Sequence, residues 1–466
     1  MRDLEKLKTE VFKRRPVLKK IYRQSGHLSL FDYVNSWKAE SGELDRQFIK
    51  ILESLLNKQL PKAETKKIIG RLKFFSLVST VDHHGILNHP FFINSNLLFS
   101  FYNSYKYLLC LSTSGVSLNN SSWPACLIYH QQGKQQRYSI FSDKDKNLPV
   151  FSHRAYRKSD IHQFLEKLQG DKLKVLAKQI FLDRRVLKCK NFSDQASLIS
   201  YKLWQKIFPK APKVVYLPLE DLASEVIAGI ISKDKRHVLH EALFARKGPE
   251  LLEKYFLGLQ GAFGPKGRGS FLFWAIDKAG RRARLERRGL KIENDEMGIG
   301  ISLNPKSIAG ALKRRKIYPT SLLCFLVLLY YGLTCLGGFN QTNWLTDIKK
   351  RFVKLLKEQK NLKLAKKIGR AVTDNFAESN LAFLTHQKKL IKASGVDIFL
   401  EGKNMYAKYR NLSKSTKLKE SIETLLPEMY RIVVPEEKRR DVLLKITDEQ
   451  IAKANGLEKQ IIEIIK

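Results

Sequence analysis

The chain has 466 residues, which exceeds one ordinary hydrophobic core, so we expect roughly two to three domains or one elaborated domain. Hydrophobic residues make up 43% of it and aromatic residues 10%, which excludes an intrinsically disordered protein. Lys and Arg number 85 against 45 Asp and Glu, a formal charge of +40. Such a charge attracts phosphate-bearing partners, but its spread along the whole chain does not single out one nucleic-acid footprint.

Five cysteines are widely spaced and form no CxxC pair: Cys110, Cys126, Cys189, Cys324 and Cys335. This pattern predicts buried free thiols in a reducing cytoplasm rather than disulfides or a zinc finger. The N-terminal stretch "MRDLEKLKTEVFKRRPVLKK" has no apolar segment of the kind that a signal peptide needs.

One apolar run, "SLLCFLVLLYYGLTCLGG" at 321–338, approaches the length of a membrane span. Tyr330, Tyr331 and Gly332 interrupt this run, so its purely apolar part is short. We therefore favour a buried helix over a membrane-spanning one, with the glycine pair at 337–338 closing that helix.

Strands and helices alternate through the first half of the chain. An amphipathic helix at 43–60 precedes three apolar strands, "FFSLVST", "YKYLLCLST" and "KVVYLPL". Three helical stretches over 159–209 separate the second strand from the third. Strands separated by helices predict an α/β core with a mostly parallel sheet.

Two hairpins are also predicted. "ACLIYH" and "RYSIF" flank a polar turn, and "SFLFWAID" and "RRARLE" flank "KAG". From about residue 360 the chain consists of polar helical stretches with no convincing strand. We expect an N-terminal helical region at 1–73, the α/β core at 74–358 and a C-terminal helical region at 359–466.

The loop after the first strand concentrates polar side chains in "TVDHHGILNHP". Ligands of α/β proteins bind at the carboxyl ends of parallel strands, so this loop is the first candidate site. His83 or His84 could serve as a general base, since imidazole titrates near neutral pH, and Asp82 would orient it. The neighbouring side chains expected to hold the substrate are Asn88, His89, Asn94 and Asn96.

Two alternative roles for this histidine-rich loop stay open. The side chains could hold a metal ion, although the consecutive residues 82–84 diverge unless Gly85 allows a tight turn. They could instead satisfy only the backbone groups of their own loop.

Three further segments carry candidate ligand contacts. The loop "STSGVSLNNSSWP" offers Ser117, Asn119 and Asn120, although turn formation is a common role for such residues. The segment "LTCLGGFNQTNW" offers Gly337, Gly338 and Gln341, where a glycine pair either caps a helix or lets a ligand approach the backbone.

The third segment is the glycine-rich "QGAFGPKGRGSFLFW", in which Lys266 and Arg268 could meet a phosphate or another anion. It fits neither the Walker pattern nor GxGxxG, because the glycines precede a strand instead of following one.

The order of these elements carries a family resemblance. The loop "VSTVDHHGILNHPFFINSNLLFS", the hairpin "FLFWAIDKAGRRARL" and the glycine pair in "LLYYGLTCLGGFNQTNW" follow one another, and a helical tail ends the chain. Over about residues 50 to 350 this succession resembles the cysteine-adding enzyme family (putative cysteine ligases) of bacillithiol biosynthesis. Where that family has a Gly-Gln-Gln turn, this chain has Asp82-His83-His84. The resemblance implies a Rossmann-like core, a coiled-coil-like C-terminal part, binding of a nucleotide such as ATP or ADP, and amide-bond formation.

The leading hypothesis is a small-molecule biosynthetic enzyme of the ligase or transferase type that binds a nucleotide or another anionic ligand. One alternative is a nucleic-acid-binding protein, favoured by the +40 charge and by "RRARLERR". Such a protein should gather aromatic side chains among basic ones on one surface. The other alternative is a metal-dependent hydrolase that uses His83, His84 and His89. A homodimer formed through the C-terminal helices is also expected.

Overall fold

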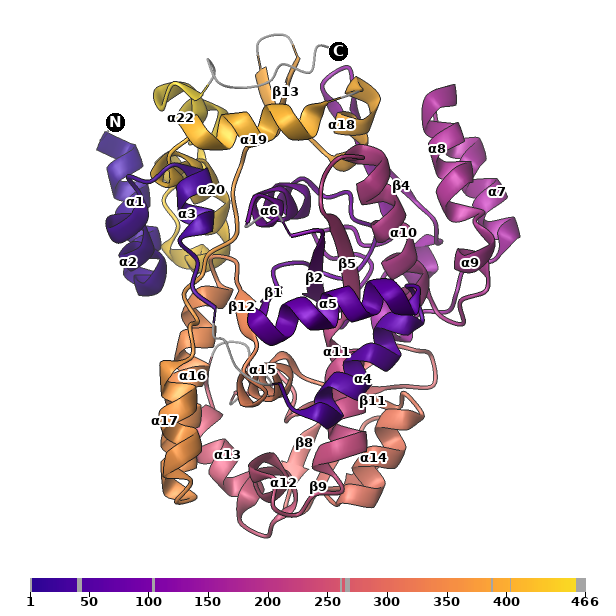
Figure 1. The fold of residues 1–466 in the computed structure, drawn as a ribbon, viewed down its shortest axis with the longest axis vertical. Coiled ribbons are helices and arrows are strands. Elements are labelled where there is room, and N and C mark those ends of the chain that lie inside the picture. Colours follow the sequence, from indigo (N-terminus) through magenta and orange to yellow (C-terminus); the bar gives the residue numbers. More distant parts are fainter. Residues whose placement is uncertain are drawn as a thin grey trace.

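A four-stranded parallel sheet organises the middle of the molecule (Figure 1). The computed structural model describes residues 2–39, 44–102, 105–259, 262–264, 269–386, 389–402 and 404–457. The sheet has the order β12-β1-β2-β5, and each neighbouring pair is parallel. Its strands are β1 (Leu77–Ser79), β2 (Tyr107–Ser112), β5 (Lys213–Pro218) and β12 (Thr334–Leu336). The predicted α/β class with a parallel sheet is confirmed.

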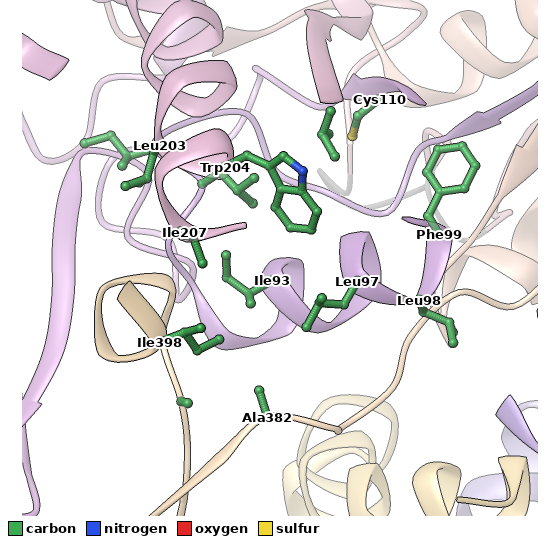
Figure 2. Packing of buried hydrophobic residues seen from close by; sticks show 14 of the residues in the cluster. Ile93, Leu97, Leu98, Phe99, Cys110, Leu203, Trp204, Ile207, Ala382 and Ile398 are labelled. Atoms are coloured by element: carbon green, nitrogen blue, oxygen red, sulfur yellow. The ribbon is translucent and has the colours of Figure 1, made fainter. Parts of the chain in front are cut away.

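Helices cover both faces of this sheet because its strands are apolar on both faces. Leu108 and Cys110 of β2 pack into one hydrophobic core, and Leu109 and Leu111 pack into a second core on the opposite face. Figure 2 shows part of the first core, which contains Trp204. The first core includes α6 (Pro90–Ser100) and α10 (Phe192–Ile207), and the second includes α4 (Arg46–Asn57), α5 (Lys62–Phe74), α11 (Leu219–Val226) and α15 (Ser321–Tyr330).

Both predicted hairpins are present. The first joins β3 (Cys126–Gln131) to β4 (Lys134–Ser139), and the second joins β6 (Phe273–Ile276) to β7 (Arg282–Arg284). The second hairpin belongs to a small sheet of order β11-β6-β7, and a further small sheet has the order β10-β9-β8. These additional strands are β8 (Glu286–Arg288), β9 (Lys291–Asn294), β10 (Ile299–Ser302) and β11 (Ile317–Pro319).

The apolar run at 321–338 differs from the prediction in its second half. The helix α15 ends at Tyr330, and Gly332 follows with a φ of 78°, which a residue with a side chain rarely adopts. The chain then forms β12, which pairs with β1. Gly337 and Gly338 therefore follow a strand, and the prediction that they close the apolar helix is wrong. None of the helices in the described part of the chain has the length and apolar character needed to cross a membrane.

Helices near the N-terminus pack against helices near the C-terminus (Figure 1). The backbone N–H of Leu30 donates to the carbonyl of Thr416 over 2.8 Å, and Lys8 forms an ion pair with Glu423 over 2.9 Å. The first three helices of the N-terminal region pack in the same hydrophobic core as the C-terminal helices, whereas α4 and α5 pack on the opposite face of the sheet. The terminal helices are α1 (Arg2–Arg14), α2 (Pro16–Ser25), α3 (Leu30–Asn35), α18 (Gly395–Glu401), α19 (Met405–Ser415), α20 (Leu418–Val433), α21 (Asp441–Leu444) and α22 (Asp448–Ala454).

The expectation of a tail without strands is wrong, because β13 (Phe383–His386) and β14 (Lys389–Lys392) form an antiparallel pair. The segment alternates only weakly between apolar and polar residues, so its pattern carries little strand signal. The remaining helices are α7 (Lys158–Lys167), α8 (Asp171–Phe181), α9 (Arg184–Leu187), α12 (Val238–Phe244), α13 (Gly248–Phe256), α14 (Pro305–Lys313), α16 (Gln341–Glu358) and α17 (Leu362–Arg370).

Candidate functional site

A cavity of about 420 Å³ lies at the carboxyl edge of the parallel sheet. Each of the four strands sends residues into its wall: Thr80 after β1, Thr113 after β2, Glu220 after β5 and Gly338 after β12. The carboxyl edge is where parallel sheets bind ligands, because the loops that leave the strands converge there. The cavity therefore occupies the place that the fold favours for a site.

The strand order strengthens this assignment. The chain adds β2 and β5 on one side of β1 and then returns to place β12 on the other side. Loops leaving β1 and β12 consequently turn in opposite directions and open a crevice between them. Thr80 and Gly338 stand at this crevice, and both line the cavity.

Of the histidine-rich loop, His83 and His89 line the cavity. The Nδ1 atom of His83 lies 3.0 Å from the hydroxyl of Ser122. That hydroxyl donates to Asn120, so His83 carries its proton on Nδ1 and donates it to Ser122. His89 caps α6, where its Nδ1 accepts the backbone N–H of Phe91 over 3.4 Å. Burial lowers the pKa of His83 to about 4 and that of His89 to about 3, so both are neutral at pH 7.

His84 is fully buried behind the cavity wall and does not line the cavity. Its Nε2 donates to the carbonyl of Ser193 over 2.8 Å, and its Nδ1 accepts from the hydroxyl of Ser112 over 2.7 Å. Burial lowers its pKa to about 4. Both ring nitrogens are engaged, so a metal site built on this loop would have to use His83 and His89 without His84.

Two of the predicted asparagines serve the fold in this structure. The side chain of Asn88 accepts the N–H of Val396 over 2.8 Å and donates to the carbonyl of Ile128. Asn94 accepts two backbone N–H groups, from Leu381 at 2.7 Å and Ala382 at 2.9 Å. Asn88 and Asn94 thus fix the C-terminal segment against the core.

Asp82 is buried in a cluster with Asn96 and Tyr216. The Asn96 amide donates to its carboxyl over 2.6 Å, and the Tyr216 hydroxyl donates to the same oxygen. Burial raises the pKa of Asp82 to about 7, against the opposing effect of these two donors. Because Asp82 contacts neither His83 nor His84 through its side chain, it does not occupy the orienting position predicted for it.

The loop after β2 contributes through other residues than those predicted. Ser117 donates to Asn119, which in turn donates to Asn147, and these contacts are exposed. Asn120 positions Ser122 by accepting a hydrogen bond from its hydroxyl. Ser121 and Ser122, rather than Ser117, Asn119 and Asn120, reach the cavity.

The glycine pair after β12 sits directly at the cavity. Gly337 pairs through its backbone with Asn375 and Ala377, while Gly338 and Gln341 line the cavity. The amide of Gln341 donates to the Thr80 hydroxyl over 2.8 Å and so links β1 to the start of α16. Lys266 and Arg268 fall outside the described residues.

Glu378, which no sequence motif marked, lies against this glycine turn. Its carboxylate accepts the backbone N–H of Phe339 over 3.0 Å, and a Cβ atom at Gly338 would overlap it. Burial raises the pKa of Glu378 to about 8, with further increases from the charges of Glu428 and Asp82. Glycine at 338 is thus what allows an acidic group to approach the end of β12.

Two more carboxyls line the cavity, Glu428 and Glu220. Burial raises the pKa of Glu428, although Lys392, 3.5 Å away, opposes this effect. Burial also raises the pKa of Glu220, which accepts hydrogen bonds from the backbone and hydroxyl of Ser114 and from the N–H of Gly115 at 2.7–2.8 Å. Three donors hold Glu220, whereas among the described residues Glu378 accepts one hydrogen bond, on a single carboxyl oxygen.

Aromatic rings and one cation complete the wall. The guanidinium of Arg282 lies 4.3 Å from the centre of the Trp274 ring and donates to the carbonyl of Gly115 over 3.3 Å. The aromatic residues that line the cavity are Phe91, Phe92, Trp274, Tyr318, Phe325, Phe339 and Trp344. Carboxyls among aromatic faces suit a ligand with an amino or other cationic group, because such a group is attracted both by carboxylates and by π-systems.

Within the described residues, no three His, Cys, Asp or Glu side chains are grouped as metal ligands. Sequence comparison assigns no family to this arrangement: no protein-family model matches the chain, and no curated protein matches it significantly.

Proposed function

We propose that the cavity at the carboxyl edge is the active site of a small-molecule enzyme of the ligase or transferase type, in which Glu378 accepts a proton from an amine. In this step the ammonium of the substrate loses a proton to the Glu378 carboxylate. The freed nitrogen lone pair forms a bond to the carbon of an activated acyl group. The bond between that carbon and its leaving group breaks, the leaving group departs with the electron pair, and it takes up the second proton that the nitrogen loses on becoming an amide.

The position of Glu378 against the glycine turn, where burial raises its pKa, is the observation that carries this proposal. A general base works best when its pKa is close to the working pH, and burial raises the pKa of Glu378 to about 8. His83 or His84 was the predicted general base, but His83 in the cavity wall has a pKa of about 4 and is a weak base, as is its neighbour His89 with a pKa of about 3. Among these three groups of the cavity wall, Glu378 has the pKa best suited to deprotonating an amine.

The composition of the wall supports an amine-bearing substrate. Glu428 lies close enough to Glu378 to raise the pKa of the latter, so a cation between them would relieve the repulsion. The Trp344 and Phe339 rings offer apolar and π contacts in the same cavity wall as Gln341. Arg282 supplies a positive charge for a carboxylate or phosphate on the acyl donor.

The features implied by the family resemblance belong to the same proposal. In the strand order, β12 lies on the opposite side of β1 from β2 and β5. This order supports a Rossmann-like core that binds a nucleotide such as ATP or ADP at the crevice between β1 and β12. The coiled-coil character of the C-terminal helices and a homodimer formed through them stay predictions.

A thermal-shift screen tests the proposal. Amino acids, simple amines, carboxylic acids, nucleotides and divalent metals are each added to the wild type, to Glu378→Gln and to Glu296→Gln. Glu296 is an exposed carboxyl and serves as the matched control. We expect an amine-bearing compound to stabilise the wild type and Glu296→Gln but not Glu378→Gln.

Two results would oppose the proposal. If Glu378→Gln keeps the full shift of every amine, Glu378 does not contact the substrate amine. If only divalent metals stabilise the wild type, and His83→Ala removes that shift, the metal-dependent hydrolase becomes the better hypothesis.

A further inference from the structure

A second cavity, of about 380 Å³, lies at the opposite edge of the same sheet. Tyr107 and Lys213, the first residues of β2 and β5, line it, whereas the first cavity is reached from the other ends of these strands. The six residues of β2 run from one edge to the other, and their five steps of about 3.3 Å correspond to about 16 Å. This amino-edge groove is therefore distinct from the proposed active site.

The charge of the amino-edge groove has one sign. Four basic side chains and no carboxyl line it: Lys106, Lys210, Lys213 and Arg410. Lys213 is paired with Glu64 over 3.1 Å. Within the described part of the chain no carboxylate lies at ion-pair distance from Lys106, Lys210 or Arg410, which are all exposed. The Arg410 guanidinium lies 5.5 Å from the centre of the Phe31 ring. Three cations without a carboxylate partner among the described residues repel each other, so an anion bound among them would be stabilised.

Aromatic rings stand among these cations. Tyr105, Tyr107, Tyr406 and Phe101 line the groove. Tyr406 is held in place by a hydrogen bond from its hydroxyl to the carbonyl of Ser100 over 2.9 Å and by the Phe101 ring at 5.7 Å. The ring of Tyr105 is held by the guanidinium of Arg71, 4.7 Å from its centre. Fixed rings of this kind can stack with planar ligands at little entropic cost.

We propose that the amino-edge groove binds a segment of single-stranded nucleic acid, with its phosphates at Lys106, Lys210 and Arg410 and a base against the partly exposed ring of Tyr105 or Tyr406. Interleaved basic and aromatic side chains on one surface are what such binding requires, because phosphates provide affinity and bases provide stacking. The +40 charge of the chain adds a long-range attraction for a polyanion.

The exposure of the cations favours a strand over a free mononucleotide. Lys106, Lys210 and Arg410 are exposed residues from three separate segments of the chain, and Lys213 is half-buried beside them. The charges thus lie along an open surface rather than around one enclosed phosphate. A single strand of nucleic acid can contact several of these cations at once, whereas a mononucleotide would leave most of them without a phosphate partner.

Fluorescence anisotropy with a labelled single-stranded RNA of about 12 nucleotides tests this inference, since binding sites of this kind span about 4–16 nucleotides. The variant Lys210→Glu/Arg410→Glu reverses two charges at the groove, and Lys363→Glu/Lys366→Glu reverses two exposed charges on α17. The net charge changes equally in both pairs. We expect the groove variant to bind about tenfold more weakly with a smaller salt dependence, and the α17 variant to change little. Glu378→Gln should bind like the wild type, which separates this result from the proposed function.

Three outcomes would overturn the inference. Equal weakening by both pairs would mean that the overall charge, and not the groove, attracts the RNA. Equal affinity for duplex RNA of the same length would argue against stacking in the groove. Complete displacement of the RNA by a comparable concentration of uridine monophosphate would assign the groove to a free nucleotide.

Discussion

Two walls of the carboxyl-edge cavity carry titratable groups whose pKa values shift in opposite directions. The histidine wall, His83 and His89, comes from the loop after β1, and the glutamate wall, Glu378 and Glu428, comes from the C-terminal part of the chain. Burial lowers the pKa of both histidines and raises the pKa of both glutamates. Desolvation favours the neutral form in each case, so the same physical effect acts on both walls.

The difference lies in where each group then titrates. His83 and His89, with pKa values of about 4 and 3, stay neutral over the physiological pH range and can only donate or accept hydrogen bonds. Glu378, with a pKa of about 8, changes its charge close to neutral pH. Burial thus removes the usual advantage of histidine as a base and gives it to a carboxyl.

The largest expected effect is the pH dependence of stability that the glutamate wall imposes. Folded wild type holds the Glu378 proton up to about pH 8, whereas the unfolded chain releases it near pH 4.5, so this group costs stability as the pH rises between these values. Glu378→Gln lacks this cost. Its stability relative to wild type should therefore grow by up to about 4 kcal/mol from pH 5 to pH 8.5.

Urea unfolding of wild type, Glu378→Gln and the exposed control Glu296→Gln across this pH range gives the comparison. A constant difference between wild type and Glu378→Gln would mean that the Glu378 carboxyl titrates normally.

The second largest effect is a difference in stability between variants of His84, which lies behind the cavity, and of His83, which belongs to the histidine wall. His84→Ala should lower the free energy of unfolding by about 2–3 kcal/mol, because it leaves a buried space and removes two hydrogen bonds. His83→Ala should cost less than about 1.5 kcal/mol, since it removes one hydrogen bond at the cavity surface. Urea unfolding of both variants measures the difference, and equal costs would show that His83 and His84 have the same structural role.

The smallest effect comes from a substitution at Gly338, which would disturb the glutamate wall. Gly338→Ala places a Cβ atom where the Glu378 carboxylate lies, so we expect a loss of about 1–2 kcal/mol in unfolding free energy. Gly70→Ala is the matched control, because Gly70 lies within α5 with open space around it, and alanine there should stabilise by up to about 1 kcal/mol. If chemical denaturation gives the two variants the same stability, Glu378 is not packed against the glycine turn.

The sequence predicted three of the four sheet strands, because each is a continuous apolar run bounded by polar residues. The fourth, β12, was missed because its three residues continue the apolar run of α15, and a run of this kind does not show where a helix ends. Gly332, which interrupts the apolar run in the sequence, marks the end of α15, whereas the prediction placed that end at Gly337 and Gly338.

For the site, the sequence pointed to His83, His89, Gly338 and Gln341, since ligand sites follow parallel strands. It could not point to Glu378 or Glu428. Glu378 lies in an irregular segment without periodicity, and Glu428 looks like a polar residue of the amphipathic helix α20. Only the packing of the C-terminal part against β1 and β12 brings these carboxyls to the cavity. Other side chains that were expected at the site because they follow the first strand instead form hydrogen bonds behind the cavity wall: Asp82, His84, Asn88, Asn94 and Asn96.

The ionisation of Glu378 can be measured directly. Carbon-13 NMR of protein labelled at the glutamate side-chain carboxyls, compared with the spectrum of Glu378→Gln, identifies the Glu378 signal, and a pH titration follows it. The proposed role as a base predicts a midpoint near pH 8. A midpoint at or below the ordinary value of 4.5 would contradict it, because a carboxyl that is fully ionised at neutral pH is too weak a base to take a proton from an amine.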